Sequence, residues 1–99
     1  MINILQTLGL AYKAKRILIG EDIITSLKTK KVVLIILTSD VSDNTRKRFH
    51  DKAKFYDVDI IESFTKSDLG EALGKGYVSA IGILDNKLKD KILNFEESR

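Results

Sequence analysis

The stretch Arg16–Thr38, RILIGEDIITSLKTKKVVLIILT, decides the fold because it holds two apolar runs separated by a glycine turn and a short helical pattern. The first run, Ile17 to Ile19, ends at Gly20. The second run, Val32 to Thr38, has no polar alternation, which is typical of a strand buried on both faces of a sheet. Residues 21–28 carry apolar side chains at helical spacing and two acids in the first turn, where carboxylates stabilise a helix. We therefore predict a strand, a helix and a central strand in this order.

The turn at Gly20 also predicts a binding property. A helix that begins directly after it offers unpaired backbone N–H groups and the positive end of its dipole. Glycine lets another molecule approach the backbone closely. The turn is therefore a candidate anion site, with phosphate as its ligand.

Helical and strand patterns alternate on both sides of this unit. Apolar spacing predicts a first amphipathic helix over residues 2–14. The polar turn 39–44 offers several N-cap candidates for a helix over 44–56, and Thr65 to Asp68 resembles a capping box. The other predicted elements are strands 59–62 and 78–84, a helix 67–73 ended by Gly74, and a last helix capped by Asp85 or Asn86, with a frayed tail from Glu96 to Arg99.

One glycine interrupts the last predicted strand. Gly82 at this position indicates that another part of the molecule approaches the backbone closely. Helices thus alternate with four short predicted strands. This pattern is typical of an α/β protein and predicts a three-layer α/β/α sandwich.

Length and composition limit the class of protein. The chain has 99 residues, enough for one domain over 1–99 with a single modest core. No apolar run approaches the roughly 20 residues of a membrane span, and the N-terminus lacks a signal-peptide pattern. Cysteine is absent and histidine occurs once, which leaves little for disulfide, thiolate or zinc chemistry. We therefore expect a cytoplasmic protein without a metal or a cofactor.

Basic charge is concentrated in two segments, although the net charge is only +3. Residues 13–31 and residues 46–54 each carry a net charge of +4. Such clusters attract polyanions, of which nucleic acid is the usual one. The alternative is two solvated helix faces, which are common on helical proteins.

Candidates for catalysis are few. His50 lies in a basic predicted helix without an acidic partner placed by the sequence, so we expect a surface or half-buried histidine. Asp40 follows the central strand, where open α/β sheets place functional groups. A receiver-type phosphoacceptor would also need a metal-binding acidic pair at the end of an earlier strand, whereas Glu21 and Asp22 fall inside a helix start. We therefore expect a noncatalytic protein in which Asp40 is a turn and cap residue.

A binding function accounts for more of the sequence. Several basic side chains flank the helix that starts at Gly20, and such side chains contact phosphates. They are Lys13, Arg16, Lys28 and Lys30. RNA fits better than DNA, because RNA presents distorted elements recognised by shape and no predicted helix resembles a long major-groove recognition helix.

Four local motifs and the order of elements carry a family resemblance. The motifs are Leu8-Gly9-Leu10-Ala11, Gly20-Glu21-Asp22-Ile23, the strand 32–38 followed by Ser39-Asp40, and Asp68-Leu69-Gly70-Glu71-Ala72-Leu73-Gly74. The chain resembles, over nearly its whole length, the kink-turn RNA-binding ribosomal protein family known as L-seven-Ae and L-thirty-e, and within it the small bacterial YlxQ-type branch. The resemblance implies a three-layer α/β/α fold with a four-stranded mixed sheet that docks on a kink-turn.

The resemblance also implies roles for single residues. The start of the second helix would enter the groove at the tandem sheared G·A pairs of a kink-turn. The loop 75–78 would cover unpaired bases, Tyr77 could stack on one of them, and Lys66 and Lys30 match basic positions of the family. The implied RNA-contact residues are Lys13, Arg16, Gly20, Glu21, Asp22, Ser26, Lys30, Lys66, Lys75, Gly76, Tyr77 and Val78.

Three residues depart from the family signature after the glycine. Asp22, Ile23 and Ser26 stand where the family carries Asn, Glu and Lys. Asp22 can accept from an adenine amino group but would repel guanine O6 and N7. Losing one good polar contact costs about 1–3 kcal/mol, so we expect weak or altered kink-turn recognition.

A second hypothesis keeps the fold and changes the function. The chain would then be a protein-interaction module of the translation machinery with only nonspecific RNA affinity. The expected partners are structured RNA, either ribosomal RNA or a kink-turn, in the first case, and ribosomal or translation proteins in the second. Neither hypothesis involves a membrane or a small-molecule substrate.

Overall fold

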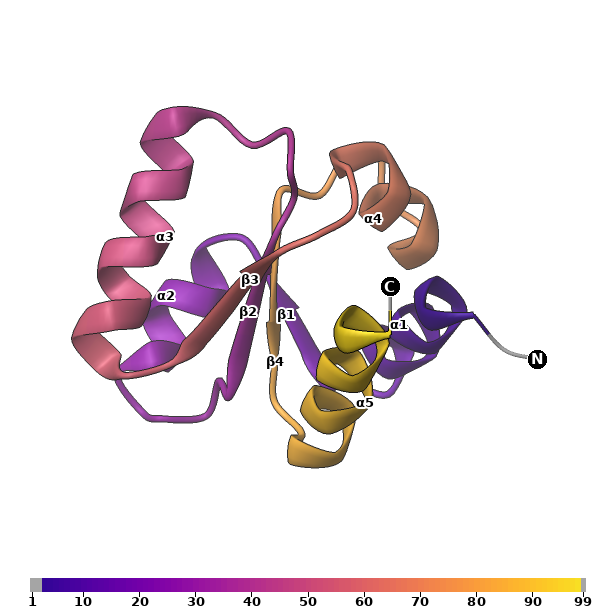
Figure 1. Ribbon diagram of the computed structural model, residues 1–99, viewed down its shortest axis with the longest axis horizontal. Helices are drawn as coiled ribbons and strands as arrows, with labels where there is room; N and C mark the ends of the chain where they lie inside the picture. The colour runs from indigo at the N-terminus through magenta and orange to yellow at the C-terminus, as the bar shows by residue number, and fades with distance from the viewer. Residues whose placement is uncertain (1–2, 99) are drawn as a thin grey trace.

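A mixed sheet of four strands lies at the centre of the computed structural model, which describes residues 3–98 (Figure 1). The strands follow the order β1-β4-β2-β3. β4 is antiparallel to both of its neighbours, and β2 is parallel to β3. The strands are β1 (Ile17–Ile19), β2 (Leu34–Leu37), β3 (Asp59–Glu62) and β4 (Ala80–Ile83).

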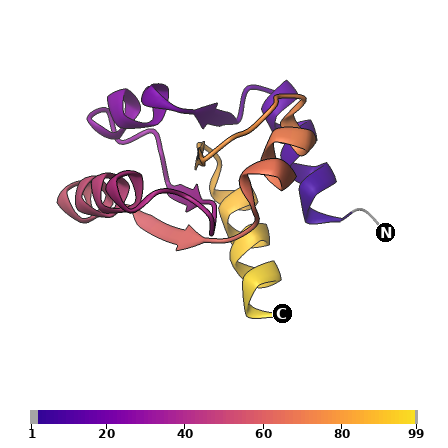
Figure 2. The same cartoon turned by 90° about the horizontal axis from the view of Figure 1, so that it is seen from above.

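Helices cover both faces of this sheet, which confirms the three-layer α/β/α prediction (Figures 1 and 2). One face carries α1 (Ile4–Lys13), α4 (Lys66–Leu73) and α5 (Asn86–Glu97). The other face carries α2 (Glu21–Leu27) and α3 (Asp43–Tyr56). Within residues 3–98, no helix combines the length and apolarity that a membrane crossing requires.

β2 is the central buried strand that the apolar run predicted. The four side chains of Leu34–Leu37 are each 0% exposed. Leu34 and Ile36 belong to the core beneath α1, α4 and α5, whereas Ile35 and Leu37 belong to the core beneath α2 and α3. The period of two along a strand thus divides one run of apolar residues between two cores.

Gly82 provides the close approach that its position in the strand predicted. A Cβ built on Gly82 would lie 3.2 Å from Cγ1 of Ile23 and 3.4 Å from Cγ1 of Val32. Ile23 is fully buried there and anchors α2 on the sheet. The missing side chain of Gly82 therefore sets how closely α2 packs on β4.

The helix starts are capped by side chains in the polar turns. Ser42 Oγ accepts from the Thr45 N–H at 3.3 Å and begins α3 one residue earlier than predicted. Thr65 Oγ1 accepts from the Asp68 N–H at 3.1 Å, and the Asp68 carboxylate accepts from the Thr65 N–H at 3.2 Å. This reciprocal pair confirms the predicted capping box and makes Lys66 the first residue of α4.

The two longest predicted strands, 32–38 and 78–84, extend beyond the observed strands β2 and β4. β2 starts two residues after the predicted strand 32–38, and β4 is shorter at both ends than the predicted strand 78–84. Val32 and Val78 are nonetheless buried, at 3% and 6% exposure. The apolar pattern therefore predicted the burial of Val32 and Val78 correctly, but neither residue belongs to a strand.

The prediction of a frayed tail was wrong for the residues that the structure describes. α5 continues through Glu97, and the Ser98 hydroxyl donates to the Asn94 carbonyl at 2.6 Å. The Phe95 ring stacks on Phe64 with centroids 6.1 Å apart, which ties the last helical turn to the core. Ile2 in the predicted first helix and Arg99 in the tail lie outside the described residues.

The substitution Gly82→Val is expected to lower the free energy of unfolding by about 1–3 kcal/mol, because the new side chain overpacks the contact with Ile23. Urea unfolding followed by circular dichroism measures the loss. Gly76→Val is the matched control, since a Cβ on Gly76 meets no atom within 4 Å. Wild-type stability of Gly82→Val would contradict the packing role of this glycine.

Candidate nucleic-acid interface

The strand register gathers four chain connections at one edge of the sheet. Leu37, at the end of β2, pairs with the first residue of β4 and with the last residue of β3. β1 ends beside the start of β4 at the same edge and leads directly into α2 through Gly20. We call this end of the sheet the Gly20 edge.

The backbone angles of the turn at residue 20 require a glycine. Its φ of 62° and ψ of −139° lie in a region that glycine adopts and other residues avoid. A Cβ on Gly20 would meet no atom within 4 Å, so the glycine is required for its backbone angles rather than for space. Within residues 3–98, no side chain makes a capping hydrogen bond at the start of α2.

A cleft of about 330 Å³ opens at the Gly20 edge between α2, α3 and the loop before β4. Tyr77 is 78% exposed at this cleft, whereas its neighbour Val78 is buried. The structure therefore brings together two predicted parts of the site that are far apart in the sequence. We call this space the Tyr77 cleft, and its lining is Ile19, Gly20, Glu21, Thr45, Arg48, Phe49, Tyr77, Val78, Ser79 and Ala80.

Arg48 holds Glu21 at the start of α2. Its guanidinium donates two hydrogen bonds to the two carboxylate oxygens of Glu21, at 2.6 and 2.8 Å. These bonds, with the charge of Arg48, keep the pKa of Glu21 below its ordinary value. Arg48 was not among the predicted site residues, and its only sequence signal was membership of the basic segment 46–54.

Asp40 is a cap residue, as predicted, but it serves α4 rather than the next helix. Its carboxylate accepts from the Lys66 N–H at 3.0 Å. Partial desolvation raises the pKa of Asp40, but hydrogen bonds, first among them that from Lys66, hold it below the ordinary value. The Lys66 carbonyl in turn accepts from the Val78 N–H at 3.2 Å. This chain of bonds ties the end of β2 to the wall of the Tyr77 cleft.

A second glycine contact positions the loop before β4. A Cβ on Gly70 would lie 2.2 Å from the Gly76 carbonyl oxygen, so α4 and the loop touch through their backbones. The Lys75 ammonium lies 5.7 Å from the centroid of the Tyr12 ring, a cation–π distance. Lys75 therefore reaches toward α1, while Tyr77 stands at the cleft.

Three predicted cations do not lie at the Gly20 edge. Arg16 precedes β1 at the opposite edge and pairs with Asp85 at 3.0 Å. Lys30, with a φ of 59°, lies at that opposite edge in the connection from α2 to β2. Lys13 lies at the C-terminal end of α1, on the other face of the sheet from α2.

The side chains of α2 divide into a buried and an exposed set. Ile23 is a core residue over Gly82, as the apolar spacing of this helix predicted. Ser26 is only half-buried in the last turn, whereas Glu21, Asp22 and Thr25 are exposed. Among the three residues that differ from the family signature, Asp22 is therefore the one that is exposed to solvent.

His50 has the acidic partner that the sequence did not reveal. Its Nε2 lies 2.9 Å from Oε2 of Glu62, and Arg46 Nε donates to the other carboxylate oxygen at 3.0 Å. The bonds from His50 and Arg46 hold the pKa of Glu62 below its ordinary value. This cluster at the surface joins α3 to β3, and none of its three residues lines the Tyr77 cleft.

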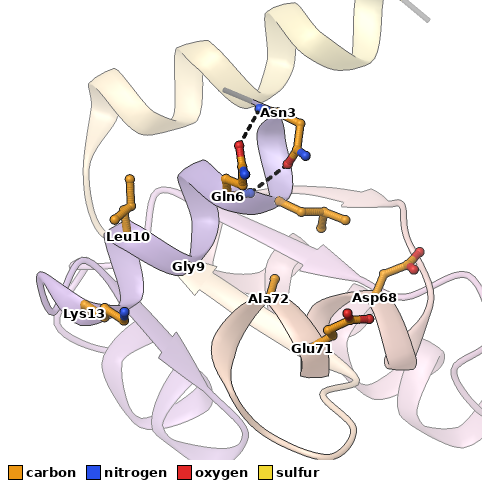
Figure 3. Close-up of a pocket in the computed structure, with 9 residues that line it drawn as sticks. Asn3, Gln6, Gly9, Leu10, Lys13, Asp68, Glu71 and Ala72 are labelled. Atoms are coloured by element: carbon orange, nitrogen blue, oxygen red, sulfur yellow. Dashed lines mark hydrogen bonds between the residues drawn. The ribbon is translucent and has the colours of Figure 1, made fainter. Parts of the chain in front are cut away.

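A larger groove, of about 690 Å³, lies between α1 and α4 on the opposite face of the sheet (Figure 3). Gly9 marks the helix contact, since a Cβ there would lie 2.6 Å from the Ala72 carbonyl oxygen. Asp68 and Glu71 stand on the α4 wall, and Lys13 is the one cation among the lining residues that the structure describes. Two carboxylates against one ammonium make this groove a poor phosphate site despite its size.

The paired Glu62 predicts a pH dependence of stability. Because its folded-state pKa is lowered, its contribution is present above the unfolded-state pKa and is lost as the pH falls through the folded-state pKa. Glu62→Gln is therefore expected to reduce stability at neutral pH and to flatten the decline between about pH 5 and about pH 3. Urea unfolding at several pH values measures both effects. An unchanged pH profile would contradict this role.

Two bacterial proteins are similar to this chain in sequence. Two relatives named RNA-binding protein YlxQ are each 31% identical to this chain. The match to the Enterococcus faecium protein spans 85 residues, 85% of this chain and 82% of that protein. The match to the Bacillus subtilis (strain 168) protein spans 88 residues, 88% of each chain.

Solved structures share the fold. A protein of unknown function from Bacillus halodurans C superposes with a TM-score of 0.86 at 30% identity, covering 95% of this chain and 96% of its own. The Giardia lamblia 15.5kD RNA binding protein superposes with a TM-score of 0.74, covering 96% of this chain and 85% of its own. At 16% identity, that second likeness concerns the fold alone. A family model also matches residues 2–93, and the chain belongs to the ribosomal protein L7Ae/L30e/S12e/Gadd45 family.

Proposed function

We propose that this chain binds structured RNA of the kink-turn type at the Gly20 edge and catalyses no reaction. The observation that carries the proposal is the Tyr77 cleft, which surrounds one open space with a glycine turn, an exposed aromatic ring and a guanidinium. Membership of the family and the name of the two YlxQ relatives support RNA as the ligand.

An unstacked base suits the chemistry of the Tyr77 cleft. Tyr77 offers an exposed ring on which a base can stack, an interaction worth about 1–3 kcal/mol per base. The buried Val78 forms an apolar wall, and the bare backbone at Gly20 permits close approach. In the proposed complex the base enters between these three residues.

The acids at the start of α2 determine which base edges are accepted. Arg48 occupies both carboxylate oxygens of Glu21, so Asp22 is the exposed acceptor of this turn. A carboxylate accepts from the amino group of adenine or cytosine and repels guanine O6 and N7. We therefore assign Asp22 to an amino group, which a sheared G·A pair can present from its adenine.

The predicted cations fall into two groups in this proposal. Lys66 starts α4 at the Gly20 edge and is the predicted cation best placed for phosphates near the cleft. Arg16 and Lys30 lie at the opposite edge, and Lys75 reaches toward Tyr12. These three residues and Lys13 add general attraction to a polyanion rather than contacts at the cleft.

The wild-type chain is expected to bind a kink-turn hairpin at least about tenfold more tightly than a straightened control RNA of equal length, because only the kinked RNA presents unstacked bases. Calorimetric titration at two salt concentrations measures the difference. Equal affinity for both RNAs would leave only nonspecific polyanion binding.

Charge-reversal variants test whether the RNA docks at the Gly20 edge or at the opposite edge of the sheet. Lys66→Glu is expected to weaken kink-turn binding about tenfold, since it places an acid beside the phosphates of the docked RNA. Lys30→Glu is the matched control, with the same charge change at the far edge, and is expected to change affinity about threefold or less. Equal losses in the two variants would contradict docking at the Gly20 edge.

A protein-interaction module is the second candidate function. The groove between α1 and α4 favours it, because its lining includes Leu5, Ala72 and Leu10, of which Leu10 is 59% exposed. A protein bound in this groove should be lost with Leu10→Asp and retained with Lys66→Glu. Kink-turn affinity should show the reverse pattern.

A further inference from the structure

Phe55 is an exposed aromatic residue that the proposed function leaves unexplained. It lies in the last turn of α3 and is 78% exposed, the same fraction as Tyr77 at the cleft. Its ring meets the ring of Tyr56 edge to face at 4.8 Å, on the side where α3 approaches the sheet. The rest of Phe55 faces solvent.

Helical spacing places Phe55 on the same side of α3 as the Tyr77 cleft. Arg48, Lys52 and Phe55 follow each other at intervals of four and three residues, which one side of a helix repeats. Arg48 lines the cleft and points to α2, as its bonds to Glu21 show. At 1.5 Å per residue, Phe55 lies about 10 Å along the helix axis from Arg48. We call these three residues the α3 stripe.

The helix that carries Phe55 is mainly basic, although the acids Asp51, Asp57 and Asp59 all lie within four residues of Phe55. α3 carries five basic and two acidic side chains, and one of these acids, Asp51, flanks the α3 stripe. α2 lies beside α3 on the same face of the sheet, and both helices run from the Gly20 edge toward the opposite edge (Figures 1 and 2). Exposed Lys28, at the end of α2, therefore lies toward the same end as Phe55.

This combination suits a nucleic-acid strand better than a protein. A protein interface centres on a contiguous apolar patch, whereas Phe55 is set among Asp51, Lys52 and Lys54. An isolated aromatic ring beside cations is the arrangement that stacks a base and neutralises its phosphates.

We propose that the α3 stripe binds a single-stranded RNA segment that leaves the Tyr77 cleft, with one base stacked on Phe55 and phosphates near Lys52 and Lys28. The inference rests on the proposed function and extends its RNA target from the kink-turn alone to a kink-turn flanked by unpaired nucleotides. Tyr77 and Phe55 are then two stacking platforms on one face.

The test compares a kink-turn hairpin with the same hairpin carrying a short oligouridine extension at its 5′ or 3′ end. Fluorescence anisotropy with labelled RNA measures affinity for the wild type, Phe55→Ala and Phe55→Tyr. One of the two extensions is expected to tighten wild-type binding about fivefold or more. Phe55→Ala should abolish this gain and leave affinity for the plain hairpin unchanged, while Phe55→Tyr should keep the gain.

The outcomes separate the inference from the proposed function. Binding of the plain hairpin without a gain from either extension, or with a gain that Phe55→Ala retains, would overturn the inference alone. Failure to bind any hairpin would overturn the proposed function, and titration of free oligouridine at low salt then tests the stripe by itself. Loss of oligouridine binding in Phe55→Ala but not in Tyr77→Ala supports the stripe, and equal binding by all variants overturns it. Because Phe55 and Tyr77 are both exposed, all variants should remain folded at the temperature of the binding measurement.

Discussion

Two helical layers meet on β2, where four consecutive side chains, Leu34–Leu37, are removed from water in alternating directions. Each such side chain contributes about 1.5–3 kcal/mol through burial. A strand with two apolar faces is stable only if helices cover both faces, so this one run requires the three-layer arrangement. β4 and β3 flank β2 on its two sides and satisfy its backbone. The five helices within residues 3–98 cover the two faces of the sheet.

The glycines adjust how closely the layers and loops approach one another. Gly82 admits Ile23 and sets the depth of α2, while Gly70 admits the backbone of the loop that ends at Tyr77. Gly20 instead supplies backbone angles that other residues avoid. The two walls of the Tyr77 cleft thus depend on positions where an added side chain would displace neighbouring atoms, side-chain atoms at Gly82 and backbone atoms at Gly70. The site is a product of packing as much as of its polar residues.

Charge is arranged on this scaffold as local pairs rather than as one uniform patch. Arg48 is matched by Glu21, and Arg16 by Asp85. The excess of basic over acidic side chains lies on α3 and in the connection after α2, where lysines outnumber acids. An RNA ligand would therefore meet fixed, oriented groups at the cleft and a looser basic surface beyond it. The groove between α1 and α4 carries more acidic than basic side chains and lies on the other face of the sheet from α2 and α3.

The sequence by itself determined the elements and their layers. The apolar run 32–38, Gly82 and the capping box at Thr65 each report a local preference for burial, close approach or a helix start, and each was confirmed. The family pattern pointed to the turn at Gly20 and to Tyr77. Only the tertiary structure decided which residues share a surface, because strand register and helix orientation fix distances between segments far apart in sequence. It joined Arg48 to Glu21 and placed Arg16 and Lys30 at the far edge, since a charged side chain in a sequence does not state which way it points.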